Sequence, residues 1–383
     1  MFKYLFVLLE DDSKSFCYYQ NDLYNSKEKK SISNDLLKKV IAYSNEHNLY
    51  LNLLIGQKKL TVNQDKLINT TQHIKYISLK LENVYNNDIL IIDNKDIHQI
   101  SSLLKSANRI IILRLEKNNI NNLNSIILSL FKKFKRLNLI LPDIEEYTRD
   151  DIDQYEKQLN ELIPSVISEY KKGNKIEINF LSDRLFLNKF NNCKAGIDHI
   201  TIAPNGKFYI CPGFYYNNEN DYIGDIENGI TNLDNKILYF DNAPACSTCD
   251  SYHCKQCVFL NRETFLEINT PSFYQQCAIA HIDREATKKI YLECKDIDPF
   301  DKITPINERI YTDPFYVYTE NHEQYNKKFF ENNKNASNIK EINNNIGKIN
   351  NSIKNIDINN PSLKEKLIRI YKMNIEILKK LDK

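Results

Sequence analysis

The first half of the chain alternates short apolar runs with amphipathic segments. Six runs are apolar enough to form buried strands, at residues 4–9, 49–55, 89–93, 109–115, 137–141 and 176–180. Between them, apolar side chains recur at helical spacing in residues 35–43, 95–107, 121–135 and 148–172. Apolar strands that alternate with amphipathic helices are typical of a parallel sheet with helical crossovers. The pattern therefore predicts an α/β fold.

The number of these units limits the architecture. A full eight-unit barrel takes about 250 residues, whereas residues 1–188 hold six strand candidates. We therefore expect a partial (β/α)6 barrel, with an open doubly wound sheet as the alternative. Neither GxGxxG nor GxxxxGK[ST] occurs in the chain, so the usual phosphate-binding loops are missing.

Residues 200–210 predict a β-hairpin. Two apolar strands flank the tripeptide Pro204-Asn205-Gly206, and Asn-Gly readily adopts the positive φ angles of a tight turn. Such a turn would bring Cys193 and Cys211, which flank the two strands, toward one end. Residues 215–221 are polar and are expected to form a loop, and residues 223–229 form a further turn-bounded segment.

A helical tail is expected after an extended linker that begins near residue 296. Isoleucines recur at spacings of three and four residues between Ile339 and Ile356, and a similar stripe runs from Leu363 to Leu381. This heptad-like pattern predicts two amphipathic helices. They either pack on the body of the protein and on each other, or bind a partner or a second copy.

Composition narrows the range of partners. The 383 residues include 52 basic and 50 acidic side chains, which gives a net charge of +2. This balance provides no overall attraction to nucleic acid or to anionic lipid. No run approaches the roughly 18 apolar residues of a membrane span. Acidic residues at 10–12 end the first apolar run where a signal peptide would need a cleavage site. We therefore expect a cytoplasmic protein with neither a nucleic acid nor a membrane as partner.

Cysteine spacing carries the strongest chemical signal. Seven of the nine cysteines lie within residues 193–277, and four of them form the run Cys246-x2-Cys249-x4-Cys254-x2-Cys257. A CxxC turn lets two thiolates reach the same metal centre, so two such turns close together predict a metal or cluster site. Thiols stay reduced in the cytosol, so clustered cysteines there indicate metal binding rather than disulfides.

The full cysteine pattern resembles a SPASM domain, the auxiliary iron–sulfur module of many radical S-adenosylmethionine (SAM) enzymes that modify peptides. It reads Cys193-x12-Gly206-x4-Cys211, then the four-cysteine run, then Cys277. Spacings within the run are two, four and two, where the family usually has two, five and three, so this is a shortened variant. The resemblance divides the chain into a partial, degenerate radical-SAM-like barrel (1–188), a SPASM-like domain (189–295), and a linker with a helical tail (296–383).

The resemblance implies two [4Fe–4S] clusters, each held by thiolates. One cluster would have a complete set of ligands, namely Cys246, Cys249, Cys254 and Cys277. The other would have three, namely Cys193, Cys211 and Cys257. Its fourth position would be open to a peptide thiolate, or filled by Cys17, Cys294, His253 or a carboxylate. No role is assigned to His199 or His281.

The loop after the first strand departs from the family. The SAM-binding cluster of radical SAM enzymes requires CxxxCxxC there, whereas residues 10–21 supply only Cys17, and no CxxxCxxC occurs elsewhere in residues 1–190. One thiolate cannot hold a cluster that needs three, so this chain is not expected to bind or cleave SAM. Cys17 itself is expected to line the core or a pocket. The opening of the chain and its cysteine module together are most similar to the CXXX repeat peptide maturases.

This similarity implies a maturation factor for a ribosomally made, cysteine-containing peptide. The protein would bind the precursor peptide or pass electrons through its clusters, either as a peptide maturase or as the non-catalytic partner of a true radical SAM enzyme. The alternative is a zinc-stabilised interaction protein without redox chemistry, because two CxxC pairs also suit a four-cysteine zinc site. The sequence assigns no catalytic residue.

Overall fold

The computed structural model describes residues 2–20, 29–82, 84–85, 88–99, 109–190, 193–233, 238, 246, 249–265 and 274–303. All of them belong to the first of two compact units, Met1–Tyr316 and Val317–Lys383. Both predicted apolar stripes of the tail, at 339–356 and 363–381, lie outside the described residues.

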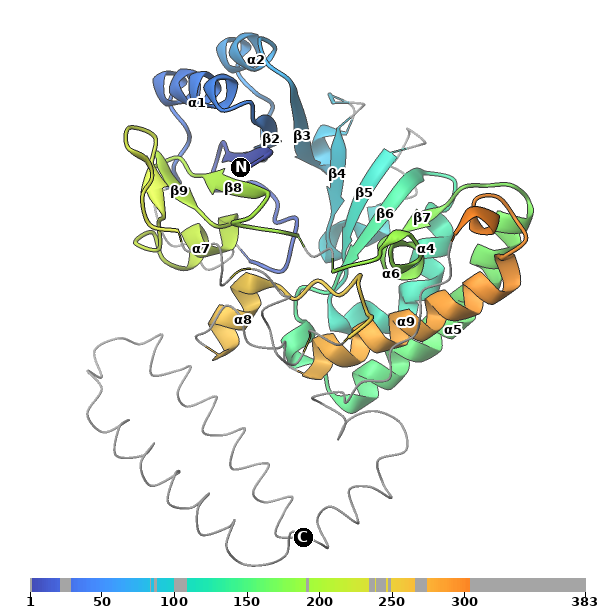
Figure 1. Cartoon of the computed structure of the whole chain (residues 1–383). Helices are drawn as coiled ribbons and strands as arrows, with labels where there is room; N and C mark the ends of the chain where they lie inside the picture. Colours follow the sequence, from blue (N-terminus) through green and yellow to red (C-terminus); the bar gives the residue numbers. More distant parts are fainter. Residues whose placement is uncertain are drawn as a thin grey trace, which may run out of the picture. The chain divides into compact units, whose positions relative to one another are not determined.

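Seven parallel strands form the first part of the sheet (Figure 1). They are β1 Tyr4–Leu8, β2 Tyr50–Leu54, β3 His73–Ser78, β4 Ile89–Ile92, β5 Arg109–Arg114, β6 Phe134–Ile140 and β7 Glu177–Ile178. Six of them coincide with the predicted strands. The sequence does not predict β3, because its residues HIKYIS mix polar and apolar side chains without a clear apolar run.

The order of these strands distinguishes a barrel wall from a doubly wound sheet. From β1 to β7 the strands lie side by side in chain order. A doubly wound sheet reverses its order at a switch point, and no reversal occurs here. Right-handed crossovers between parallel strands taken in order place the connecting helices on one face. The predicted α/β fold with a large, mainly parallel sheet is confirmed.

Helices and short 3-10 turns connect the strands. They are α1 Asn34–Glu46, α2 Val62–Ile68, η2 Leu79–Leu81, η3 Asn94–Gln99, η4 Lys117–Asn122, α4 Leu123–Leu130, η5 Ile144–Glu146, α5 Arg149–Lys171, α6 Asn179–Ser182 and η6 Asp183–Phe186. The predicted helix at 121–135 ends early, because β6 begins at Phe134. With seven residues, α2 is too short to show a helical period, although Thr61 and Gln64 form a capping box at its start.

The cysteine-rich segment extends the same sheet beyond β1. Its strands are β8 His199–Ile202, β9 Lys207–Tyr209, β10 Gly224–Asp225 and β11 Gly229–Ile230. β8 pairs in parallel with β1, with Tyr4 opposite His199, and β9 to β11 follow as an antiparallel meander. The predicted hairpin is confirmed, with Gly206 at a φ of +76° in its turn. One eleven-stranded sheet therefore runs through both parts of the chain.

Three longer helices and one short turn complete the cysteine-rich segment. They are α7 Pro212–Asn217, α8 Val258–Phe265, α9 Tyr274–Cys294 and η9 Phe300–Lys302. The polar loop expected at 215–221 is wrong for its first residues, because Tyr215 and Tyr216 are buried in α7. α9 runs alongside α5 (Figure 1). Tyr155 of α5 and Asp283 of α9 join the two helices by a hydrogen bond of 2.6 Å.

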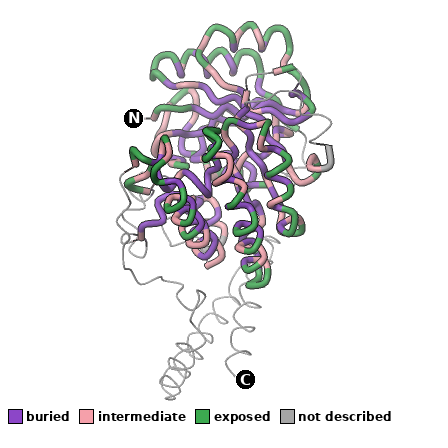
Figure 2. The backbone as a smooth tube through the Cα atoms, turned by 90° about the vertical axis from the view of Figure 1, so that its right-hand side faces the viewer, coloured by how far each residue is buried: buried purple, intermediate pink, exposed green. Residues whose placement is uncertain are grey.

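Burial separates the strands from the outer faces of the helices. In Figure 2 the tube is mainly buried along the strands and alternates between buried and exposed along the helices. An aromatic cluster covers β1, with ring-centroid distances of 5.0 Å from Phe6 to Phe16 and 4.8 Å from Phe6 to His199. Tyr76 of β3 adds a third contact, 5.2 Å from Phe16. These rings link β1, β3, β8 and the loop after β1 into one core.

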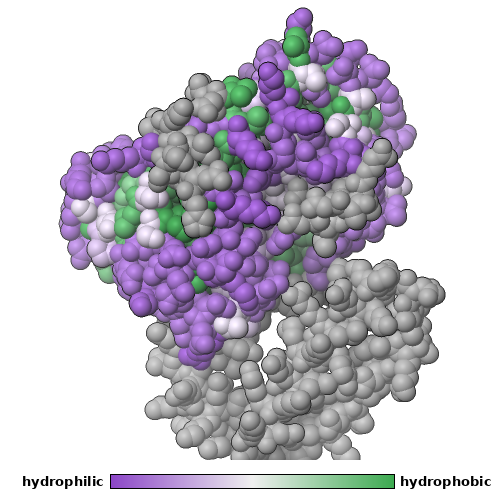
Figure 3. Space-filling model, turned by 180° about the vertical axis from the view of Figure 1, so that it is seen from behind, coloured by the Kyte–Doolittle hydropathy of each residue, from purple (hydrophilic) through white to green (hydrophobic). Residues whose placement is uncertain are grey.

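The described surface is mainly hydrophilic on the face seen in Figure 3, where hydrophobic residues form separate patches. Within the described ranges, no helix combines the length and the apolar character that crossing a membrane requires.

Candidate metal centre

The loop that follows β1 is fixed by buried polar contacts. The buried Asp11 carboxylate accepts hydrogen bonds from the Tyr215 hydroxyl at 2.9 Å and from the Lys30 backbone N–H at 2.8 Å. Burial raises the pKa of Asp11, and these two bonds oppose that shift. The Tyr216 hydroxyl donates to the Asp11 carbonyl at 3.2 Å. Since both tyrosines lie in α7, the end of β1 is tied directly to the cysteine-rich segment.

Strands β4 and β5 hold the same loop from another side. The Lys14 ammonium pairs with the Asp93 carboxylate, which lies just after β4. Arg114, the last residue of β5, donates hydrogen bonds to the carbonyls of Cys17 and Tyr19, both at 3.2 Å. In barrels, functional residues gather at the carboxyl ends of the strands. Here the charged side chains at these ends position the backbone around Cys17.

Four further cysteines come from distant parts of the chain. We call them the distributed group: Cys17, Cys193, Cys211 and Cys257. Interaction with Cys257 is the first cause of a lowered pKa for Cys17, and interaction with Cys17 is the first cause of a raised pKa for Cys257. Burial and the charges of Cys193 and Cys17 raise the pKa of Cys211. Cys193 is exposed, Cys17 and Cys211 are half-buried, and Cys257 is buried.

The other four cysteines of the pattern form a second group. We call them the local group: Cys246, Cys249, Cys254 and Cys277. The Cys249 N–H donates to the Cys246 carbonyl at 3.1 Å, which closes the first CxxC turn. Burial and the charges of Cys246 and Cys249 raise the pKa of Cys254. Cys277 joins them from the first turn of α9, where it shares a neighbour, His281, with Cys249.

His281 lies between two sulfurs of the local group. Its Nε2 atom is 4.0 Å from the Cys249 sulfur and 3.9 Å from the Cys277 sulfur. Burial alone would raise the pKa of Cys249, but the contact with His281 and the Ser251 N–H lower it overall. The Gln256 side-chain amide also contacts the Cys246 sulfur. The local group is thus surrounded by donors that stabilise negative charge on sulfur.

A backbone N–H also reaches a sulfur of the local group. The Ser251 N–H donates to the Cys249 sulfur at 3.4 Å. Such a bond favours the thiolate form, and hydrogen bonds to the sulfurs are one of the means by which proteins tune iron–sulfur clusters.

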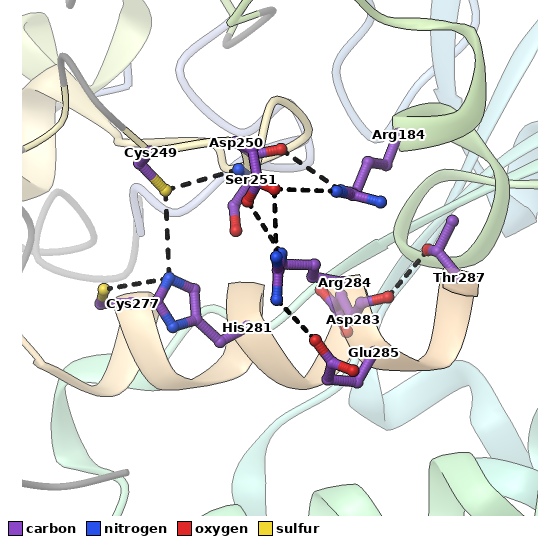
Figure 4. A network of polar contacts seen from close by, with 10 residues as sticks. All are labelled: Arg184, Cys249, Asp250, Ser251, Cys277, His281, Asp283, Arg284, Glu285 and Thr287. Atoms are coloured by element: carbon purple, nitrogen blue, oxygen red, sulfur yellow. Dashed lines mark hydrogen bonds and ion pairs between the residues drawn. The ribbon is translucent and has the colours of Figure 1, made fainter. Parts of the chain in front are cut away.

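A buried ionic network anchors the local group to the rest of the fold (Figure 4). Asp250, which follows Cys249, has no exposed surface. Its carboxylate accepts from Arg284 of α9 at 2.8 and 3.1 Å and from Arg184 of η6 at 3.3 Å. Arg184 also donates to the Asp250 carbonyl at 3.2 Å. Two arginines from separate elements thus fix the chain directly beside a predicted ligand.

Two residues that the sequence leaves as possible ligands lie away from the distributed group. Cys294 is buried at the end of α9, where burial raises its pKa and the charges that act on it are Lys171 and Glu293. His253 is buried beside Asp283, with 3.8 Å between its Nε2 and a carboxylate oxygen. Burial, followed by nearby positive charges, lowers the pKa of His253 to about 3.

His253 and Asp283 also line a small cavity of about 50 Å³, together with Cys254, Lys255 and Gln276. Burial raises the pKa of Asp283 well above its usual range. The cavity separates the local group from the carboxyl end of β6, which contributes Leu139 and Leu141 to its wall.

The sequence did not predict that several of these residues lie near the cysteine groups. For Cys17, the one indication in the sequence is its position after the first strand. His281 has a clearer one, because it lies four residues after Cys277 on a helix and so shares its face. No sequence pattern indicates the roles of Asp250 and Arg114, because their hydrogen-bond partners are distant in the sequence.

The donor set of both groups is thiolate, which suits an iron–sulfur cluster and also a four-cysteine zinc site. Among the described residues, which include all nine cysteines, no three His, Cys, Asp or Glu side chains are close enough to hold one metal ion.

Comparisons with solved structures identify the fold. The chain is similar to anSMEcpe, an anaerobic sulfatase-maturating enzyme of the radical SAM superfamily, in a structure with bound AdoMet. The TM-score is 0.53 and the identity 15%, over 76% of this chain and 99% of that one. The structure of the same enzyme with AdoMet and the Kp18Cys peptide gives a TM-score of 0.52 at 15% identity, again over 76% and 99%. The chain therefore has a radical-SAM-like fold.

A more distant similarity is to Streptococcus suis SuiB bound to its precursor peptide SuiA. The TM-score is 0.36 and the identity 12%, over 57% of this chain and 61% of that one. No protein-family model and no curated protein matches the sequence.

Proposed function

We propose that this protein is a maturation factor for a ribosomally made, cysteine-containing peptide, and that it carries two [4Fe–4S] clusters. The proposal is supported by the seven-cysteine pattern on a radical-SAM-like fold. Within the local group, His281 lies 4.0 Å from the Cys249 sulfur and 3.9 Å from the Cys277 sulfur. The SPASM-like module, taken as residues 189–295, would supply the seven thiolates.

The ligand roles follow the groups. Cys246, Cys249, Cys254 and Cys277 would hold one cluster, and Cys193, Cys211 and Cys257 would hold the other. When bound, such clusters supply one-electron transfer. The chain's own residues hold the thiolates in place and donate hydrogen bonds to sulfur, as Ser251 does to Cys249. Three of these ligands, Cys246, Cys254 and Cys257, are buried.

The protein would not cleave SAM by itself. The loop after β1 offers one thiol where a SAM-binding cluster needs three, and Lys14 and Arg114 fix that loop by contacts with Asp93 and with its own backbone. A separate, intact radical SAM enzyme would therefore perform the radical step. This chain would bind the precursor peptide or pass electrons to that enzyme.

A peptide partner is supported by the comparison with anSMEcpe, one structure of which contains a bound peptide named Kp18Cys. It is also supported by the similarity of the cysteine pattern to peptide maturases. A cysteine in the precursor would suit a protein that gathers thiolates and iron in one module.

The first test concerns the metal. Anaerobically purified protein should be brown, absorb near 400 nm, and contain about eight iron atoms per chain, as two [4Fe–4S] clusters require. With dithionite and SAM alone it should release no 5′-deoxyadenosine. Colourless protein that holds one or two zinc ions would overturn the cluster assignment and favour a zinc-stabilised interaction protein.

The second test concerns maturation. A short cysteine-containing precursor and an intact radical SAM enzyme encoded beside this chain would be co-produced with and without it, and the precursor weighed by mass spectrometry. A mass change that requires this chain supports the proposal. Equal conversion in its absence would contradict it. Cys294→Ala is the matched control, because Cys294 lies outside both groups.

A further inference from the structure

We propose that the cavity between β6, α9 and residues 253–255 binds a small carboxylate, with the Lys255 ammonium as its cationic partner. The carboxylate belongs either to an acidic side chain of a peptide or to a small free carboxylic acid. The cavity does not depend on a metal or a cluster, so only the peptide form rests on the proposed function. Neither the cysteine pattern nor the similar solved structures assign a role to this cavity.

The cavity is small and its wall is buried. It has a volume of about 50 Å³ and lies where the end of β6, the start of α6 and the first half of α9 meet residues 253–255. One water site needs about 10–15 Å³ of such volume, so the cavity has room for one small group of atoms. The described residues of its lining are buried, except Lys255, which is half-buried. A ligand would therefore enter beside Lys255 and bury its tip.

Lys255 supplies positive charge without a fixed counter-ion. Its ammonium group forms no ion pair with any residue that the structure describes. The charge of Lys255 nevertheless acts on His253 and Asp283, which line the same cavity. A charge that is held partly out of water interacts more strongly with a counter-ion than a fully solvated charge does. The cavity therefore favours an anionic ligand.

His253 offers a second polar group. Its side chain is 4% exposed, and neither ring nitrogen meets hydrogen-bond geometry with a described residue. The Ala280 backbone lies close enough to act on the ring, and an Asp283 carboxylate oxygen is 3.8 Å from Nε2. Buried polar atoms normally have hydrogen-bond partners. An oxygen atom of the ligand would complete the bonding of one ring nitrogen.

Asp283 is the acidic residue among the described lining residues, and it does not neutralise Lys255. Its carboxylate accepts a hydrogen bond of 2.6 Å from the Tyr155 hydroxyl and forms no ion pair with Lys255. Burial raises the pKa of Asp283 well above its usual range, which favours the uncharged form of the carboxyl group. Asp283 therefore opposes a bound anion less than an ordinary aspartate would.

The rest of the wall selects a carboxylate among small anions. Five apolar side chains contribute to it, namely Leu139, Leu141, Ile144, Phe180 and Ile279. A carboxylate has two oxygens for the two donors Lys255 and His253, and a carbon chain that packs on the apolar wall. Phosphate would bury further oxygens against that wall without hydrogen bonds, which is unfavourable.

A peptide anchored in this cavity would lie beside the local group. Cys254 lines the cavity, and so does Tyr18 from the loop after β1. An acidic side chain bound here would hold the peptide backbone next to Lys255. In the peptide form of the proposal, the precursor therefore carries Asp or Glu near its cysteine.

The test measures binding to anaerobically purified full-length protein by ligand-detected NMR titration at constant ionic strength. The probes are sodium acetate, N-acetylaspartate amide, N-acetylasparagine amide and sodium phosphate. Acetate should bind to the wild type. Lys255→Met keeps the length of the side chain but removes its charge, and should weaken acetate binding at least about tenfold, because a charge-assisted hydrogen bond is lost. Lys295→Met is the control, since Lys295 is exposed and does not line the cavity.

The probes also distinguish the two sources of the carboxylate. Tighter binding of N-acetylaspartate amide than of acetate supports an acidic side chain of a peptide, and the reverse supports a small free acid. The proposal would be overturned if neither carboxylate bound, or if acetate bound equally well to the wild type and to Lys255→Met. It would also fail if phosphate bound more tightly than acetate, or if N-acetylasparagine amide bound as tightly as N-acetylaspartate amide.

A measurement on the unmodified protein covers the case in which Lys255→Met does not fold. Lysines are acylated with an N-hydroxysuccinimide ester, with and without acetate, and the modified lysines are quantified by mass spectrometry. Acetate should slow the acylation of Lys255 and leave that of Lys295 unchanged. Equal acylation of Lys255 with and without acetate would contradict the proposal.

Failure of this inference and failure of the proposed function give different results. A protein that takes part in peptide maturation but binds no carboxylate would overturn the inference about the cavity alone. A protein that binds acetate through Lys255 but contributes nothing to peptide maturation would overturn the proposed function and leave the cavity with a small free acid as its ligand.

Discussion

The two cysteine groups are assembled in opposite ways. The local group lies within residues 246–277, and a CxxC turn and one end of α9 bring its members together. The distributed group takes Cys17 from the loop after β1, Cys211 from the start of α7, and Cys257 from the residue before α8. One group is therefore built from neighbouring segments and the other from both ends of the described fold.

This difference shows which parts of the structure each group needs. Closing a longer loop of chain costs more entropy, although the cost grows slowly with length. For the distributed group, sheet pairing offsets that cost, because β8 lies beside β1 with Tyr4 opposite His199. The local group depends instead on the buried Asp250 network (Figure 4). Substitutions at these supports should therefore separate the two groups.

The largest loss in the free energy of unfolding is expected when the Asp250 network beside the local group is broken. Asp250→Ala leaves Arg184, whose side chain is 4% exposed, and Arg284, at 17%, without their shared carboxylate. Removing one partner of a buried ionic network costs about 3–5 kcal/mol. Urea unfolding should show this loss, with iron leaving the local group first. Glu285→Ala is the control, because its half-exposed pair with Arg284 is worth at most about 1 kcal/mol. Equal losses in the two variants would refute the distinction.

A somewhat smaller effect is expected at the support of the distributed group. Arg114→Met keeps the length of the side chain but removes two hydrogen bonds to loop carbonyls. Hydrogen bonds from a charged group are worth about 1.5–3 kcal/mol each, so losing two should lower the free energy of unfolding by about 3 kcal/mol, the lower end of their sum, because Met also avoids the cost of burying a charge. Iron should be lost from the distributed group only. Lys117→Met, which removes an exposed partner of Glu146 at 3.9 Å, should change neither quantity.

Acid should lower the free energy of unfolding through His199, which pairs β8 with β1. Burial, opposed only by Asp198, lowers the pKa of His199 from 6.5 to about 4. In the unfolded chain, His199 therefore becomes protonated below about pH 6.5, whereas in the folded protein it stays neutral down to about pH 4. Stability is unaffected by this group above pH 6.5 and falls as the pH drops through that window. Between pH 7 and pH 5 the loss should be about 2 kcal/mol.

The comparison is made with His199→Phe, which keeps the ring beside Phe6 but cannot titrate. Urea unfolding of both proteins at pH 7 and pH 5 isolates the contribution of this side chain, because acid effects common to both cancel. An equal loss of stability in the two proteins would show that His199 does not titrate as described.

The smallest loss in the free energy of unfolding is expected for the contact between α7 and the loop after β1. Tyr215→Phe removes the hydrogen bond to the Asp11 carboxylate at 2.9 Å and keeps the buried ring. The expected cost is about 1 kcal/mol in the free energy of unfolding, measured by urea titration. Tyr222→Phe is the matched control, since Tyr222 is 41% exposed. A larger effect at Tyr222 would mean that the bond to Asp11 does not help to join the two regions.

Local patterns in the sequence determined much of this protein. Runs of apolar residues specify six of the seven strands from β1 to β7, and Asn205-Gly206 specifies the hairpin turn. The spacing of CxxC pairs defines most of the local group. These features depend on residues close together in the chain, where strand period, turn chemistry and ligand spacing can be read directly. The strand β3 was missed because polar residues such as Lys75 interrupt its apolar positions.

Only the tertiary structure decided the rest. Strand order set β1 to β7 side by side and placed β8 on the other side of β1. Packing of α9 and η6 brings Arg284 and Arg184 to Asp250. None of these partners has a fixed spacing in the sequence, because each lies on a separate element. The physical reason is that a buried thiol or carboxylate must find its partners in space, and packing alone determines which remote side chains reach it.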